Sequence, residues 1–94
     1  MIVPTIHLNG TSGTELLEQV TDAGQAIYEA VKVLQKAFPH ARDYYVQPDY
    51  PAEFEQARKE WEARREHLMV VYRELEDLAG KISNEIDSRE FQKK

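Results

Sequence analysis

Cationic and aromatic side chains are concentrated in residues 39–45 of this 94-residue chain, which read Pro-His-Ala-Arg-Asp-Tyr-Tyr. An arginine guanidinium can fork onto a phosphate or a carboxylate, and a tyrosine ring can stack on a base or donate its hydroxyl. The sequence therefore predicts a nucleotide-like ligand site that consists of His40, Arg42, Asp43, Tyr44 and Tyr45 with Lys36 nearby. A purely structural role also fits, in which Arg42 and Asp43 pair with loop backbone or helix ends and the tyrosines cover the open end of a hairpin.

A second candidate lies in residues 7–14, a polar turn with glycines that leads into a helix N-terminus. Free amides and the helix dipole favour an anion there, although the Gly-Lys-Ser/Thr ending of a P-loop is missing and simple helix capping is the alternative. Within one hairpin this turn is about 35–40 Å, one helix length, from Arg42. An antiparallel dimer would bring the two clusters together, so Asn9 and Thr11 of one chain are expected to complete the Arg42 site of another.

The order of signals along the chain predicts one domain of two helices with a short extended arm. Residues 1–11 form the arm, and Ser12 with Glu15 resembles a capping box that begins a helix over 12–38. Pro39 helps to stop that helix, a loop follows over 39–50, and Pro51 favours a restart. The second helix is expected over 51–84, and the charged residues 85–94 are expected to fray.

Apolar residues recur three and four positions apart in both predicted helices, which is the pattern of a coiled-coil-like pair. The fold class is therefore all-α, an antiparallel two-helix hairpin that assembles into a homo-oligomer. The predicted register places Ala30 opposite Trp61 and Ala23 opposite Leu68. A second apolar stripe is left over for self-association: Leu17, Tyr28, Val31, Met69, Tyr72 and Ala79. The two predicted contact rows are Leu16, Val20, Ala23, Ile27, Ala30, Leu34 and Ala37, and Phe54, Ala57, Trp61, Arg64, Leu68, Val71, Leu75, Leu78 and Ile82.

Composition excludes several classes of function. The 17 acidic residues outnumber the 12 basic ones, which argues against binding to duplex nucleic acid. The absence of cysteine excludes disulfides, thiol catalysis and thiolate metal sites. No apolar run approaches the roughly 20 residues that cross a bilayer, so we expect a cytoplasmic protein without a membrane partner. No catalytic motif, clustered histidines or dinucleotide motif occurs, so we expect no enzyme activity, no metal and no cofactor.

The combination of Ile6-His7-Leu8-Asn9-Gly10-Thr11-Ser12, a helix, Pro39-x-x-Arg42-Asp43-Tyr44 and a second long helix resembles small proteins of phage and prophage accessory regions. The order of helix, proline, Arg-Asp-Tyr and helix is also similar to the hairpin domain of phage sponges, which sequester the nucleotide second messengers of CBASS and Thoeris defence. That resemblance implies an oligomer that holds a cyclic oligonucleotide or an ADP-ribose derivative between protomers without cleaving it. It also implies the cytoplasm of a host cell as the compartment.

The leading hypothesis is thus a phage-type anti-defence protein that sequesters a nucleotide signal. The alternative is an acidic helical module that inhibits or modulates a host protein, gripping it through Tyr28, Val31, Met69 and Tyr72. A structural phage component without a ligand is a third possibility.

Overall fold

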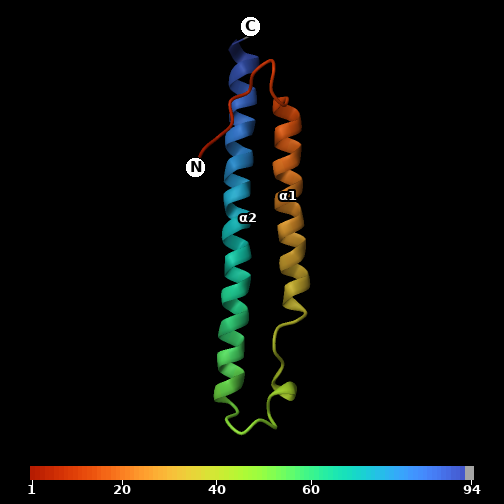
Figure 1. Cartoon of the computed structure of the whole chain (residues 1–94), viewed down its shortest axis with the longest axis vertical. Helices are drawn as coiled ribbons and strands as arrows, with labels where there is room; N and C mark the ends of the chain where they lie inside the picture. Colours follow the sequence, from red (N-terminus) through yellow and green to blue (C-terminus); the bar gives the residue numbers. More distant parts are fainter. Residues whose placement is uncertain (93–94) are drawn as a thin grey trace.

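Two long antiparallel helices make up almost the whole molecule (Figure 1). The computed structural model describes the backbone of residues 1–92 and the side chains of residues 1–89. Helix α1 spans Gly13–Gln35, a short 3-10 helix η1 spans Ala41–Asp43, and helix α2 spans Ala52–Gln92. No strand occurs within residues 1–92, so the predicted all-α hairpin is confirmed.

The predicted start of the first helix is confirmed, and its predicted end is wrong by about one turn. The Ser12 hydroxyl accepts a hydrogen bond from the Glu15 amide at 3.1 Å, which satisfies one of the free amides at the start of α1. At the other end, the amides of Lys36, Ala37 and Phe38 bond to carbonyls three residues earlier. The last turn therefore tightens after Gln35, and Phe38 lies outside the helix.

The register of the hairpin differs from the predicted one by about two helical turns. Tyr28 contacts Tyr72 with ring centroids 5.3 Å apart, and Phe38 lies 6.1 Å from Trp61. Near the other end, Gly13 closely approaches Ile86. Trp61 is therefore level with Phe38, not with Ala30. The loop runs beside the first turns of α2, so α1 ends well before it reaches the start of α2 (Figure 1).

This register changes which apolar residues face the partner helix. Val31 and Ile82 are the most buried apolar side chains, 4% and 1% exposed. The predicted self-association stripe is therefore wrong in part, because Val31 is buried in the hairpin and Tyr28 and Tyr72 contact each other. Conversely, the predicted contact row of the first helix is only half correct. Its larger members, Leu16, Val20, Ile27 and Leu34, are half-buried, while its alanines, Ala23, Ala30 and Ala37, are exposed.

The C-terminal segment continues the second helix. The predicted end of the second helix at residue 84 is wrong, because α2 runs through Gln92. That residues 85–94 fray stays a prediction, and residues 93–94 lie outside the described part of the chain. Ile86 is half-buried and lies beside Gly13 and Ile6, so the arm and the start of α1 give this end of α2 a packing surface. The arm crosses from the start of α1 toward α2 (Figure 1).

The molecule is a thin rod of 70 × 19 × 19 Å. Its radius of gyration is 20.4 Å, whereas a compact domain of this length has about 12 Å. Two helices in one layer cover each other along a single side, which explains the small number of buried side chains. None of the helices within residues 1–92 is both long enough and apolar enough to cross a membrane.

Candidate functional site at the loop end of the hairpin

The loop between the helices is held by its own backbone and by one aromatic residue of α2. Two amides, those of Tyr44 and Tyr45, bond to the Ala41 carbonyl at 3.0 and 2.9 Å, and the Asp43 amide bonds to the His40 carbonyl at 3.0 Å. The Tyr44 ring lies 5.7 Å from the Phe54 ring, and the Tyr50 ring lies 6.2 Å from it. The turn that carries Arg42 is thereby fixed to the start of α2.

The predicted loop residues separate into a structural and an available group. Tyr44 is half-buried against Phe54, so the structural role that the sequence left open applies to this tyrosine. Tyr45 is 63% exposed, and His40, Arg42 and Asp43 are exposed as well. Among the described side chains, Arg42 enters no ion pair, not even with its neighbour Asp43. The exposed group thus offers one guanidinium, one imidazole, one carboxylate and one free aromatic ring.

The second predicted cluster lies at the opposite end of the rod. Asn9 and Thr11 are exposed. The arm that carries them leads into the start of α1 (Figure 1). The arm turns there through a bond from the Gly10 amide to the His7 carbonyl, 3.2 Å long. Capping by Ser12 already occupies the Glu15 amide, which favours the capping role over anion binding within this chain. A single chain therefore does not bring Asn9 and Thr11 to Arg42.

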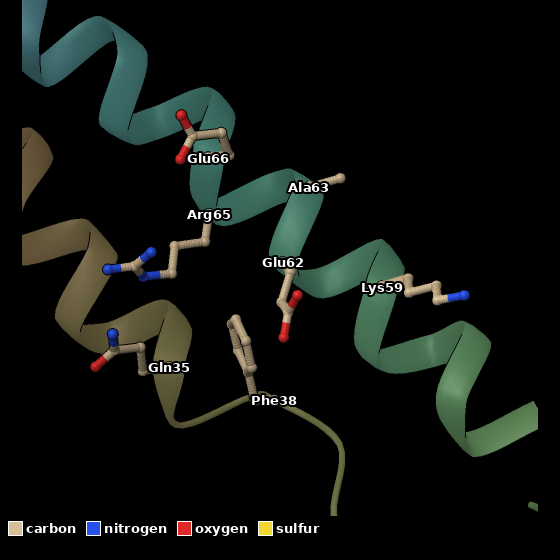
Figure 2. A pocket seen from close by; sticks show the side chains of 7 residues that line it. All are labelled: Gln35, Phe38, Lys59, Glu62, Ala63, Arg65 and Glu66. Atoms are coloured by element: carbon tan, nitrogen blue, oxygen red, sulfur yellow. The ribbon is translucent and has the colours of Figure 1, made fainter.

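A hollow that the sequence did not predict lies where α1 ends against α2. It has a volume of about 710 Å³ and is open to solvent on one side. Figure 2 shows Phe38 pointing toward α2 and Arg65 reaching from α2 toward Gln35. The lining residues are Gln35, Phe38, Lys59, Glu62, Ala63, Arg65 and Glu66. It is large enough for a nucleotide but shallow, and ligand pockets usually enclose most of their ligand.

The acidic residues of this hollow form ion pairs and, within the described part of the chain, its basic residues do not. Glu62 pairs with Arg58 at 3.7 Å and Glu66 pairs with Arg73 at 2.7 Å, so both acids have cationic partners. Lys59 and Arg65 have no such partner among the described side chains. Neither residue belongs to the site that the sequence predicts. The missing signal was the register, because only the level of Phe38 relative to α2 brings Phe38 and these two residues to the lining of one hollow.

A further polar cluster lies on the side of the hairpin that carries Tyr28 and Tyr72. The Lys32 ammonium lies 5.0 Å from the centre of the Tyr28 ring and 3.3 Å from the Glu29 carboxylate. Partial burial, followed by the nearby Glu76 carboxylate and Tyr28, raises the pKa of the Tyr72 hydroxyl. Tyr72 is therefore protonated at neutral pH.

Neither metal ligands nor similar known proteins indicate a function for this site. Within the described residues, no three histidine or acidic side chains are grouped as metal ligands would be. No protein-family model, no curated protein and no solved structure matches this chain. The geometry of the loop end thus carries the functional argument.

Proposed function

We propose that this protein is a non-catalytic binding protein that sequesters a nucleotide second messenger, either a cyclic oligonucleotide or an ADP-ribose derivative. The observation that carries the proposal is the exposed group at the loop end, where Arg42 has no ion-pair partner among the described side chains and Tyr45 is 63% exposed. A guanidinium in that state binds a phosphate without first giving up another partner, and a free ring beside it can stack on a base.

Each residue of the group then has a separate role. Arg42 contacts phosphate, Tyr45 stacks on the base, and His40 and Asp43 form hydrogen bonds with the sugar or the base edge. Tyr44 acts indirectly, because its packing on Phe54 fixes the turn. Lys36, exposed at the end of α1, adds a positive charge, and Asn9 and Thr11 complete the site from another protomer.

The proposed activity is retention of the ligand without cleavage. Arg42 and Tyr45 supply binding contacts, a fork onto phosphate and a ring for stacking. Phage-type anti-defence activity is the biological role that such retention would serve.

A direct test incubates the purified protein with a panel of cyclic oligonucleotides and ADP-ribose derivatives, removes the protein by filtration, and analyses the heated retained fraction by chromatography. The proposal predicts depletion of one ligand and its recovery intact. Recovery of an altered molecule would indicate an enzyme instead, and no depletion across the panel would contradict nucleotide sequestration.

Substitution of Arg42 locates the site. Arg42→Ala should weaken binding by about 1–3 kcal/mol, the usual range for a hydrogen bond to a charged group, without changing the oligomeric state. Lys59→Ala is the control, because Lys59 is another exposed cation without an ion-pair partner among the described side chains, and it lines the hollow of Figure 2. If Lys59→Ala weakens binding and Arg42→Ala does not, the ligand lies in that hollow and the assignment to the loop is wrong.

A second candidate function is the inhibition or modulation of a host protein. The observation in its favour is apolar surface that remains exposed on α1 and α2, including Val33 at 63% and Val71 at 41%. The residues expected to carry this contact change, because Val31 is buried and Tyr28 and Tyr72 contact each other. A host pull-down is the decisive experiment if no nucleotide is retained.

A further inference from the structure

One face of the hairpin carries exposed apolar side chains. On α1, the exposed residues Ala23, Ala26, Ala30 and Val33 recur at steps of three and four, so they share one side of the helix. They lie roughly 160° around α1 from Tyr28, given about 100° per residue. On α2, the exposed Val71 and the half-buried Leu78 lie seven residues apart in one row, which the exposed Arg64 continues. We call this surface the alanine face, and its members are Ala23, Ala26, Ala30, Val33, Val71 and Leu78.

The total exposed surface of the chain leaves room for an interface of the size that a dimer needs. The chain exposes 7131 Å², whereas a compact monomer of 10.9 kDa exposes about 5,600 Å². The excess is about 1,500 Å², which lies within the roughly 1,000–2,500 Å² that each chain buries in an obligate homodimer. The excess is therefore of the size that each chain would bury on pairing with a second copy.

The face is also complementary to itself in one orientation. Val71 lies at the middle of α2, so antiparallel pairing about Val71 overlaps two α2 helices along their whole length. Phe38 is level with Trp61, which puts Val71 level with Tyr28, so the same two-fold axis passes α1 midway between Ala26 and Ala30. Ala26 then faces Ala30 of the partner, and Ala23 faces Val33 of the partner. The alanines at the centre of the interface allow close approach of the helices, and next to the centre the small Ala23 faces the larger Val33.

The charges at the edge of the face match in the same orientation. Glu60 and Lys81 lie at nearly equal distances along α2 on either side of Val71, and so do His67 and Glu74. All four are exposed, and each is three or four residues from Arg64, Val71 or Leu78. Antiparallel pairing thus places Glu60 beside Lys81 of the partner and His67 beside Glu74 of the partner. Lys81 already pairs with Asp77 at 3.1 Å, so Glu60 would extend that pair into a network.

We infer that the alanine face is a homodimer interface in which two hairpins pack antiparallel about Val71. The inference does not depend on a ligand, yet it deepens the proposed function. In this dimer the loop end of each hairpin lies beside the arm end of its partner. Asn9 and Thr11 of one chain then approach Arg42 of the other, which a single chain does not achieve.

Two adjacent valines allow a matched test of the face. Val70 and Val71 are 40% and 41% exposed, but Val70 points away from α1 and only Val71 belongs to the alanine face. Light scattering coupled to size-exclusion chromatography should give twice the 10.9 kDa chain mass for the wild type and for Val70→Glu. Val71→Glu should raise the dimer dissociation constant by about 100-fold or more, because two carboxylates would face each other in an apolar interface. A monomeric wild type, or equal effects of both variants, would overturn the inference.

Cross-linking tests the orientation and does not rely on a disruptive variant. The chain has no cysteine, so Val71→Cys introduces a single thiol, and helices that pack closely at a two-fold axis bring two such thiols within disulfide range. Oxidation should join Val71→Cys chains into covalent dimers at low concentration and should leave Val70→Cys chains largely separate. A dimer in solution whose Val71→Cys form does not cross-link would overturn the antiparallel register. Ligand retention is measured separately, so loss of the dimer and loss of nucleotide binding are distinguishable.

Discussion

Two glycines of the helices have different surroundings, and these decide what an added methyl group does. At Gly80, in the exposed middle of α2, a Cβ atom would meet nothing within 4 Å. At Gly13, a Cβ atom would lie 2.7 Å from Ile86 Cγ1 and 2.9 Å from Ile6 Cδ1. Gly13 therefore permits the close approach of α1, α2 and the arm, whereas Gly80 only lowers the helix propensity of α2.

Substitution by alanine should consequently have opposite effects at the two sites. Gly80→Ala is expected to raise the free energy of unfolding by about 1 kcal/mol, the difference in helix propensity between the two residues. Gly13→Ala is expected to lower it by about 1–3 kcal/mol, because the new methyl group overpacks the contact with Ile86. Urea unfolding at one fixed protein concentration measures both. A stabilising Gly13→Ala would show that the arm and α2 do not pack on this glycine.

The loop and the start of α2 form one unit at the level of elements. Phe54 contacts Tyr44 and Tyr50, and no part of α1 reaches this level of α2. The loop therefore covers the apolar side of the first turns of α2, which α1 would cover in a hairpin with a short connection.

Phe54→Ala should release the loop without unfolding the hairpin. The amides of Tyr44 and Tyr45, which bond to the Ala41 carbonyl, are expected to exchange with solvent faster, while amides near Val31 and Leu75 keep their protection. Tyr45→Ala is the control, because this exposed ring contacts nothing that fixes the turn. Hydrogen exchange followed by mass spectrometry measures both. Unchanged loop exchange in Phe54→Ala would show that the aromatic contacts do not hold the turn.

The sequence predicted the number, type and direction of the helices because periodicity and capping are local signals. Ser12 shows this, since its hydroxyl caps α1 as expected. The register was not predictable in the same way. Helix α1 carries two rows of apolar residues, and the spacing alone does not say which row packs against α2. The position of the loop decides between them, and it depends on contacts of Tyr44 and Tyr50 with Phe54 that no spacing rule reveals. For the same reason, the sequence indicated the exposed loop cations but not the hollow beside Phe38.

At the scale of the whole molecule, the shape and the proposed function support each other. A rod of 70 × 19 × 19 Å keeps its two polar clusters at opposite ends, and it exposes apolar side chains of the alanine face near its middle. Antiparallel association through the alanine face would bury that surface and form two equivalent composite sites per dimer. Binding to such sites links two chains, so a retained nucleotide should also stabilise the dimer.

Native mass spectrometry tests the dimer and the bound nucleotide in one measurement. The protein is first incubated with the nucleotide panel and then freed of unbound ligand. The proposals predict a mass of two chains plus one or two intact nucleotides, and loss of the nucleotide mass in Arg42→Ala while the dimer remains. A dimer that carries no nucleotide from any member of the panel would contradict sequestration and leave the interface standing. A monomer without ligand would contradict both.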